Sequence, residues 1–479
     1  MNFIEDVMER VPASTLGIVA VDAAGNRRQW HYGELIARSA GLSGAMAARG
    51  VERGDAVMTL VGSRIEWVLA MLACFRMGAV AMPCNPQLRR KDLEVRVNAA
   101  DPKLCIGEEE LLGELPDGVA AMTMADVAYS LDEDRPQETP TEAAELDPED
   151  PAVIIFTSGT TGYPKGVLYP QRYLTGQRLQ AEHWVGARKG ELAWCTAAPG
   201  WSKSTRNVFI APWLCGAAAL ICDSRFDPGE RLAIVEREGV NVLCQAPTEY
   251  RILAKRTELR PVSSLRRMIS AGEPLNPEVI RVFRETMGRG IGDGYGQTET
   301  GAISGMRPDE DDPERDGSMG RPLPGVETRL VDGELQVRHH TVPSFFSHYL
   351  DEAPFEGEWW ATGDHVREDD DGHLWFEGRD DDIIITAGYR VGPFEVESAL
   401  VSHPAVAEAA AVPAPDEERG SVVRAVVVLA DGDPSDELAA ELQDHVKRVT
   451  APYKYPRIVE FTDELPKTPS GKIRRAELR

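Results

Sequence analysis

The residues around position 160 combine the chemical groups that hold phosphate oxygens. Residues 153–156 are apolar and predict a short buried strand. The sequence Thr-Ser-Gly-Thr-Thr-Gly-Tyr-Pro-Lys-Gly follows directly as residues 157–166. Its glycines allow close approach of the main chain to a ligand, its hydroxyls donate hydrogen bonds, and Lys165 adds a compact positive charge. We interpret this stretch as a phosphate-binding loop, although the order differs from the common Gly-Lys-Ser/Thr pattern. The alternative is a flexible linker.

A second polar stretch, residues 293–299, reads Asp-Gly-Tyr-Gly-Gln-Thr-Glu. Tyr295 offers a flat face on which adenine can stack, and Thr298 can donate to a phosphate. Glu299 would lie close to phosphate charge, which is costly unless the carboxylate holds a metal ion. Mg²⁺ bound by one carboxylate and nucleotide oxygens fits this arrangement. The alternative is an ordinary polar loop.

These motifs resemble those of the adenylate-forming superfamily, which contains acyl- and aryl-CoA synthetases, firefly-type luciferases and the adenylation domains of peptide synthetases. Further motifs follow in the order of that family at residues 270–274, 359–364, 388–397 and 465–475, so the resemblance covers essentially the whole chain. Residues 200–204, 388–397 and 451–457 are most similar to medium-chain acyl-CoA synthetases. The region before the phosphate loop is short for that subgroup, and residues 334–357 are compressed.

The resemblance implies a site for ATP. The nucleotide-binding residues would be Thr157, Ser158, Gly159, Thr160, Thr161, Gly162, Gly272, Glu273, Pro274, Asp293, Gly294, Tyr295, Gly296, Gln297, Thr298, Asp364, Arg379 and Arg390. Asp364 would accept hydrogen bonds from the ribose hydroxyls, and Arg379 would reach the same nucleotide with its fork of donors. The catalytic residues would be Lys165, Thr298, Glu299 and Lys472, with Glu299 as the Mg²⁺ ligand. Lys472 would meet the charge that develops as a carboxylate attacks the α-phosphorus.

The same resemblance implies sites for the acyl group and for coenzyme A. Trp201, Ala271 and Gly296 would line the acyl pocket. Acetate-selective relatives carry Trp at the position of Gly296, so we predict an open pocket and an acid larger than acetate. For Phe209 and Trp213, pocket lining and plain core packing are equally compatible with the sequence. Gly388 and Tyr389 would line the tunnel for the CoA thiol, and Asp381 would be the hinge of a rotating domain.

The elements that must position these residues alternate between strands and helices. Residues 27–50 predict a strand and an amphipathic helix, and residues 57–61, 66–77 and 79–82 predict strand, helix and strand, with Gly78 ending the helix. We therefore predict an α/β fold: a large N-terminal domain of wound α/β sheets with a β-barrel-like subdomain, residues 1–380, and a small, mobile C-terminal α+β domain, residues 381–479. The acidic stretch 130–150 is interpreted as an exposed linker within the large domain.

Composition narrows the class of protein. The 479 residues carry a net charge of −26, which argues against nucleic acid or an anionic membrane as a general partner. The seven cysteines are scattered without a Cys-x-x-Cys pair, so we expect reduced thiols and a cytoplasmic protein. The histidines show no metal-ligand spacing, and His339-His340 is interpreted as a surface pair. We find no secretory signal, and the longest apolar run, residues 67–75, is too short to span a bilayer.

We therefore predict an ATP-dependent carboxylate–CoA ligase. Its partners would be a carboxylic acid, ATP and CoA, and its cofactor Mg²⁺. The favoured acid is a medium straight chain, followed by branched or aryl acids, and the oligomeric state is left open, with a homodimer as one option. Alternatives are a stand-alone adenylating enzyme that performs one half-reaction or loads a carrier protein, an aryl-CoA ligase, and a non-catalytic nucleotide-binding protein of the same fold.

Overall fold

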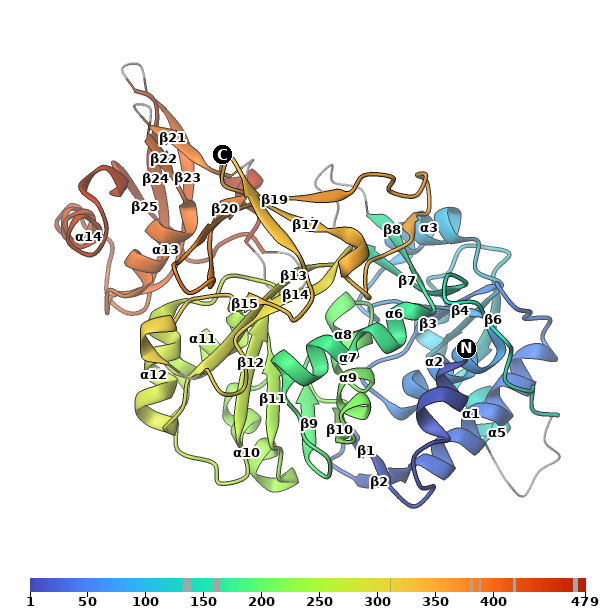
Figure 1. Cartoon of the computed structure of the whole chain (residues 1–479). Helices are drawn as coiled ribbons and strands as arrows, with labels where there is room; N and C mark the ends of the chain where they lie inside the picture. Colours follow the sequence, from blue (N-terminus) through green and yellow to red (C-terminus); the bar gives the residue numbers. More distant parts are fainter. Residues whose placement is uncertain are drawn as a thin grey trace.

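Two large sheets form the main body of the protein, shown with its smaller C-terminal part in Figure 1. The structure is a computed structural model that describes residues 1–131, 139–157, 164–310, 312–379, 382–386, 389–416, 419–467 and 473–479. Among these residues, nine strands form the larger sheet in the order β15-β14-β13-β12-β11-β9-β10-β1-β2. Their bounds are β1 Leu16–Val21, β2 Arg27–His31, β9 Leu192–Cys195, β10 Ala218–Cys222, β11 Val242–Gln245, β12 Arg267–Ala271, β13 Ile291–Gln297, β14 Gly301–Gly305 and β15 Arg321–Pro322.

The second large sheet carries the phosphate-loop hairpin. Its order is β18-β8-β7-β4-β3-β5-β6, with β3 Ala56–Leu60, β4 Val80–Pro83, β5 Leu104–Gly107, β6 Ala120–Thr123, β7 Pro151–Thr157, β8 Lys165–Pro170 and β18 His348–Tyr349. The centres of both sheets are parallel, and antiparallel strands lie at their margins. In parallel sheets the carboxyl ends of the strands share one edge, where ligands bind. This arrangement confirms the predicted wound α/β fold.

Helices cover the sheets and follow the strand–helix alternation expected from the sequence. They are α1 Tyr32–Ala47, α2 Ile65–Met77, α3 Arg90–Ala100, α4 Glu109–Leu112, α5 Met124–Ser130, α6 Arg172–Gly176, α7 Arg178–Gln180, α8 Ser202–Asn207, α9 Ile210–Leu214, α10 Pro228–Glu238, α11 Pro247–Arg256 and α12 Pro277–Met287. Gly78 ends α2 with a φ of 75°, a left-handed conformation that favours glycine. Helix α1 ends at Ala47, before the Gly50 that we expected to end it. No described helix is long and apolar enough to cross a membrane.

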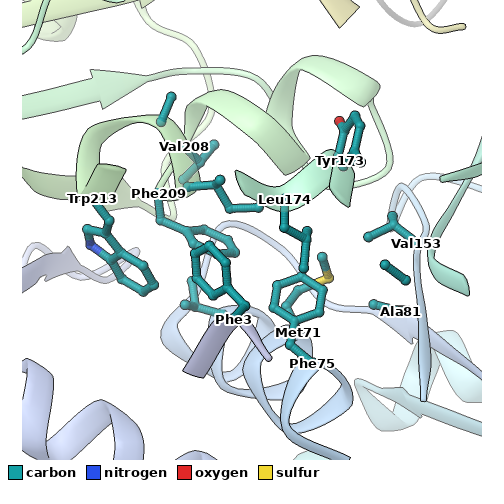
Figure 2. Packing of buried hydrophobic residues seen from close by; sticks show 14 of the residues in the cluster. Phe3, Met71, Phe75, Ala81, Val153, Tyr173, Leu174, Val208, Phe209 and Trp213 are labelled. Carbon is teal, nitrogen blue, oxygen red and sulfur yellow. The ribbon is translucent and has the colours of Figure 1, made fainter. Parts of the chain in front are cut away.

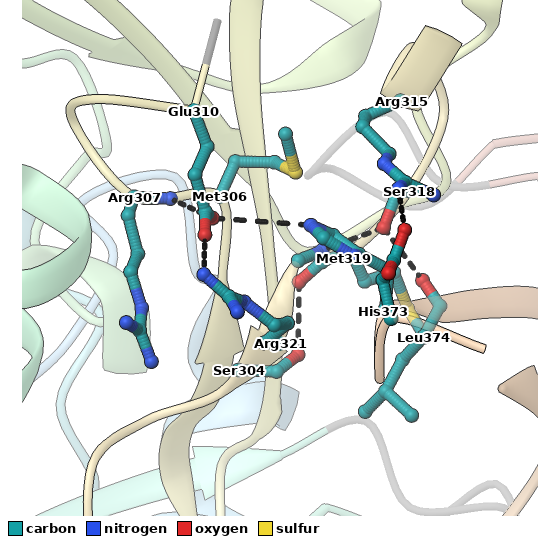
Figure 3. A network of polar contacts seen from close by, with 12 residues as sticks. Ser304, Met306, Arg307, Glu310, Arg315, Ser318, Met319, Arg321, His373 and Leu374 are labelled. Atoms are coloured by element: carbon teal, nitrogen blue, oxygen red, sulfur yellow. Dashed lines mark hydrogen bonds and ion pairs between the residues drawn. The ribbon is translucent and has the colours of Figure 1, made fainter. Parts of the chain in front are cut away.

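A third sheet stands where the barrel-like subdomain was predicted. It is antiparallel, in the order β16-β17-β19-β20, with β16 Thr328–Val331, β17 Glu334–Arg338, β19 Trp359–Glu368 and β20 Leu374–Arg379. A polar network joins the turn before β20 to the segment between β14 and β15 (Figure 3). Glu310 binds the Arg321 guanidinium, accepts from the backbone N–H of Arg307 at 3.1 Å and lies 3.9 Å from His373. The network fixes this sheet, which carries Asp364, against the large sheet.

The C-terminal part has its own apolar core. It contains β21 Ile384–Thr386, β22 Tyr389–Val391, α13 Pro393–Val401, β23 Val406–Asp416, β24 Gly420–Leu429, α14 Asp436–Val449 and β25 Ile458–Phe461. Val396, Leu400, Val427 and Leu442 are among the residues of this core. Its contacts with the large domain include hydrogen bonds from Lys255 to the Ala407 carbonyl and from Asn276 to the Ser398 carbonyl. The small domain is confirmed, whereas the boundary between residues 380 and 381 stays a prediction.

The largest apolar cluster lies between the two large sheets (Figure 2). Phe209 is fully buried, with ring centroids 5.6 Å from Trp67 and 5.0 Å from Trp213. The indole N–H of Trp213 donates to the Gly17 carbonyl at 2.9 Å. Phe209 and Trp213 therefore belong to the core, and of the two interpretations of these residues core packing is correct. All seven cysteines lie in the described ranges and are free, as predicted.

Truncation of Phe209 tests this assignment. Phe209→Ala removes a ring packed on both sides, and we expect the free energy of unfolding to fall by about 3–5 kcal/mol, measured by thermal and denaturant unfolding. Val331→Ala, on exposed β16, is the control and should change it by less than about 0.5 kcal/mol. A Phe209→Ala protein that unfolds like wild type but changes its preference among acids would instead place the ring in the substrate pocket.

Candidate active site

The β7–β8 hairpin sets the ends of the predicted phosphate loop. Thr157, the last residue of β7, pairs in register with Lys165, the first residue of β8. Lys165 Nζ donates to Glu352 Oε1 at 2.6 Å and lies 4.7 Å from the centre of the Tyr349 ring. The hydrogen bond to Glu352 raises the pKa of Lys165. The ammonium is therefore held charged at the mouth of the loop, while Ser158, Gly159, Thr160, Thr161 and Gly162 lie outside the described residues.

Thr298 and Glu299 lie beside this hairpin. The Tyr349 hydroxyl donates to Glu299 Oε1 at 2.8 Å, and burial, followed by the charge of Glu299, raises the pKa of Tyr349. The Thr298 carbonyl accepts from the Tyr169 hydroxyl at 2.6 Å, and its side-chain oxygen lies 3.5 Å from Ser202 Oγ. These contacts orient both residues. Sequence reasoning missed Tyr349 and Glu352 because they lie in a stretch without a recognisable motif.

The other end of the site is built around Asp364. Its carboxylate accepts hydrogen bonds from the Tyr295 hydroxyl and, at 3.0 Å, from Gln297 Nε2. Arg379, paired with Asp364 across β19 and β20, brings Nη1 to 3.7 Å from Asp364 Oδ1. Burial and the adjacent Asp364 carboxylate raise the pKa of Tyr295. The predicted adenine and ribose residues are thus already in contact.

The turn after β12 is pinned to α11. Glu273 accepts from Thr248 Oγ1 at 2.8 Å and from Arg251 Nη2 at 2.9 Å, so its carboxylate holds the turn that contains Gly272 and Pro274. Lys203 Nζ donates to the carbonyl of Ala271, at the end of β12, at 2.9 Å. Sequence reasoning gave Lys203 no role of its own. The Glu273 side chain supports the nucleotide turn through α11.

Asp293 is buried rather than exposed to a ligand site. Its side chain is 3% exposed and accepts from the Gly294 backbone N–H at 3.0 Å. Burial raises the pKa of Asp293 well above its usual range. In this conformation the carboxyl is directed at its own strand, and the predicted nucleotide contact of Asp293 stays a prediction.

Strand pairing gives Gly296 a second explanation, independent of the acyl pocket. A Cβ atom built on Gly296 would lie 1.8 Å from the Gly301 carbonyl oxygen and 2.7 Å from Ala302 Cα, because β14 approaches closely at a register shift between Tyr295 and Gly296. Glycine is required here by strand pairing. The close approach of β14 is thus a sufficient reason for glycine at this position, and the open acyl pocket stays a prediction. Trp201 is half-buried at the start of α8 and Ala271 is buried at the end of β12, and their role in the acyl pocket also stays a prediction.

The predicted small-domain residues are only partly described. Lys472, Gly388 and Asp381 lie outside the described residues, and Arg390 is described only as part of β22. Tyr389 is 54% exposed and stacks on Tyr453 at 4.6 Å. Lys467 and Ile473, which flank the segment that contains Lys472, form an antiparallel β-bridge.

A small cleft lies between the Lys467–Ile473 bridge and the turn after β12 of the large domain. Glu273 and Pro274 line one side, and Lys467, Ile473 and Arg475 line the other. Lys467, Ile473 and Arg475 therefore lie across this cleft from the predicted nucleotide-binding residues Glu273 and Pro274. For Mg²⁺, Glu299 offers one carboxylate beside the hairpin, which fits a site completed by substrate oxygens. The described residues contain no group of three His, Cys, Asp or Glu side chains that could hold a metal ion.

Replacement of Asp293 by Asn gives a pH-dependent prediction. The unfolded carboxyl ionises near its usual 3.8, whereas the folded one is held neutral by burial. Stability is therefore lost as pH rises from the unfolded pKa toward the folded pKa, by up to about 1.4 kcal/mol per pH unit. We expect the melting temperature of Asp293→Asn to gain on wild type between about pH 5 and pH 7. A constant difference across this range would show that Asp293 is ionised in the fold.

Comparison with known proteins agrees with this geometry. The family model described as AMP-binding enzyme matches residues 8–366, and that of the AMP-binding enzyme C-terminal domain matches residues 395–472. The chain is 39% identical to the uncharacterized acyl-CoA ligase YtcI of Bacillus subtilis, covering 96% of this chain and 91% of that protein. It is 37% identical to the human mitochondrial acyl-coenzyme A synthetase ACSM4, covering 96% and 85%.

Among solved structures, the anthranilate CoA ligase AuaEII in complex with anthranoyl-AMP matches with a TM-score of 0.89 and 29% identity over 100% of this chain and 96% of that chain. The reaction class is accordingly the ATP-dependent ligation of a carboxylate to CoA through an acyl-adenylate. The chain therefore belongs to the AMP-binding enzyme family, and within the adenylate-forming superfamily it stands with the acyl-CoA synthetases.

Proposed function

We propose that this protein converts a medium-chain carboxylic acid, or an acid of similar size, into its CoA thioester in the two half-reactions of its family. The observation that carries the proposal is the convergence of groups from distant segments on one site. Lys165 comes from the β7–β8 hairpin, Thr298 and Glu299 from the β13–β14 turn, and Asp364 from β19. Free CoA is the favoured thiol acceptor, and a carrier-protein pantetheine is the alternative.

In the proposed assignment the nucleoside lies at the Asp364 end. Tyr295 stacks on adenine, Asp364 accepts from the ribose hydroxyls, and Arg379 supports the same nucleotide. The phosphates lie at the Lys165 end, where Thr298 donates to them. Glu299 would hold Mg²⁺, which supplies positive charge between phosphate oxygens when it is bound.

The first half-reaction begins when a carboxylate oxygen of the acid attacks the α-phosphorus of ATP. The bond from that phosphorus to the pyrophosphate oxygen breaks, and the acyl-adenylate forms. Lys165 and Lys472 place positive charge where negative charge develops, so their contribution is larger in the transition state than in the ground state. Closing the site around the adenylate excludes water from a reactive mixed anhydride.

For the second half-reaction we propose a rotation of the small domain, residues 381–479, about Asp381 relative to residues 1–380. The rotation brings Gly388 and Tyr389 to the site as the tunnel for the CoA thiol. The thiolate sulfur attacks the acyl carbonyl carbon, and AMP leaves with the carboxyl oxygen that linked it. The exposed Tyr389–Tyr453 pair lies on the domain that would supply this tunnel.

We place the enzyme in the cytoplasm, with small-molecule partners rather than nucleic acid or membranes. Its free cysteines suit a reducing compartment, and its net charge of −26 repels polyanions. A homodimer is the assembly to test first, by light scattering of the purified protein.

A panel of carboxylic acids tests the proposed function. Pyrophosphate release should depend on the acid, and medium-sized acids should exceed acetate by about tenfold or more. Thioester should form when CoA is added. Adenylation without transfer to CoA would favour the carrier-protein alternative, and background release with every acid would contradict the enzyme assignment.

Replacement of Lys472 separates the half-reactions. Lys472→Ala should slow adenylation by about 10²–10³-fold, because it removes charge that acts on the transition state. Thioester formation from supplied acyl-adenylate should be preserved. Lys447→Ala, a partly exposed lysine of α14 paired with Asp444, is the matched control and should leave both steps unchanged. Equal loss of both steps in Lys472→Ala would refute the assigned role.

A further inference from the structure

Arg206 is a buried cation without a counter-charge in the described part of the chain. Arg206 is 6% exposed, and its Nε and Nη1 atoms are buried without a hydrogen-bond partner. No Asp or Glu of the described ranges forms an ion pair with it. Burial of a guanidinium is costly unless it is paired, so the position calls for an anion from outside the chain.

Its place in α8 relates this cation to the active site. Ser202 and Arg206 are four residues apart and lie on the same face of the helix. Ser202 Oγ is 3.5 Å from Thr298 Oγ1, next to the proposed phosphate positions. Arg206 therefore lies one helical turn beyond Ser202, about 6 Å farther along the helix axis. A rise of about 6 Å corresponds to the length of a few carbon–carbon bonds.

Two tyrosines connect Arg206 to the same place. Tyr169, which donates to the Thr298 carbonyl, stacks on Tyr173 with ring centroids 4.1 Å apart. Burial raises the pKa of both phenols, and the charge of Arg206 acts in the opposite direction on both. The guanidinium is thus an electrostatic neighbour of the two rings, behind Thr298.

Two buried polar atoms on α8 and on the neighbouring α7 also lack partners, Thr205 Oγ1 and Gln180 Oε1. The Tyr173 hydroxyl contacts Arg206, and against the larger, raising effect of burial this contact lowers the pKa of the phenol. Gln180 is joined to α8 by a hydrogen bond of 3.0 Å from its Nε2 to Asn207 Oδ1. Figure 2 shows the Tyr173 hydroxyl turned away from the apolar cluster that packs its ring. A purely apolar acyl tail would leave this polar set unsatisfied, which is unfavourable.

We propose that Arg206 binds a second anionic group at the far end of the acyl substrate. This inference rests on the proposed function and names the substrate class: a short acid with a carboxylate at each end, of which only the one near Thr298 is adenylated. A guanidinium and a carboxylate match in geometry and can form two parallel hydrogen bonds. The Tyr173 hydroxyl would supply a further donor. Arg206 is then a specificity-determining residue for the known reaction.

Matched acids test the inference on the wild-type enzyme. Each dicarboxylic acid of a length series is compared with its monomethyl ester and with the monocarboxylic acid of equal chain length, using ATP-dependent pyrophosphate release. We expect kcat/KM for the best dicarboxylic acid to exceed that of both partners by about 100-fold or more, because the partners leave a buried cation unpaired. Equal or better use of the monocarboxylic acid overturns the inference and leaves the proposed function intact. Release with no acid at all overturns both.

A variant gives a readout that a merely structural arginine would not change. Arg206→Met keeps an unbranched side chain and removes the charge, so the ratio of kcat/KM between dicarboxylic and monocarboxylic acid should fall by about 100-fold. The matched control is Arg178→Met, an arginine whose side chain is 54% exposed and pairs with Glu182, and its ratio should equal that of wild type. An unchanged ratio in Arg206→Met overturns the inference. The wild-type series decides the question independently if Arg206→Met fails to fold.

Discussion

The charged groups that hold a nucleotide must also be compensated when the nucleotide is absent, and this constraint shapes both ends of the site. At the phosphate end, Lys165 pairs with Glu352 through side chains that are 35% and 46% exposed. An exposed pair of this kind contributes about 0–1 kcal/mol, so phosphate oxygens can replace Glu352 at small cost. At the nucleoside end, Asp364 is 5% exposed and held by Tyr295 and Gln297. The Lys165–Glu352 pair can therefore be replaced by phosphate contacts, whereas the contacts of Asp364 with Tyr295 and Gln297 persist when the nucleotide binds.

This difference follows from the elements that carry the residues. Asp364 lies on β19, which pairs with β20, and Tyr295 lies on β13, which pairs with β14. Sheet hydrogen bonds and the Glu310 network fix the positions of these strands. Lys165 begins a strand at the mouth of a loop, and Glu352 follows the short strand β18. Rigid strands suit the recognition of a flat base and a ribose. A hairpin end suits phosphates, which leave as pyrophosphate during the reaction and must therefore be released.

The sequence predicted the fold class and the location of the nucleotide motifs, because both depend on residue type and spacing. Periodicity identified α2, and Gly78 marked its end. Side-chain direction depends instead on register and burial. Asp293 belongs to a polar motif, yet its strand buries it, and the approach of β14 requires glycine at position 296 whatever the acyl pocket needs. Tyr349 and Glu352 could not be found from motifs, because only the folding of β18 beside β8 gives them a role.

Arg206 illustrates why the identity of the acid is harder to predict from a sequence than the class of reaction. The reaction needs particular groups at particular positions around ATP, so its residues recur in recognisable order. The acid is recognised by whatever lines the far end of its pocket, and a single arginine among 52 basic residues carries no signal of its own. Burial supplies the missing information. On an exposed surface this guanidinium would be solvated, whereas beside Tyr169 and Tyr173 its charge has to be met by something. A neutral water could satisfy an N–H group but could not balance the charge, and an alkyl tail could do neither. A carboxylate does both, which is why the polarity of this buried position is a guide to the acid.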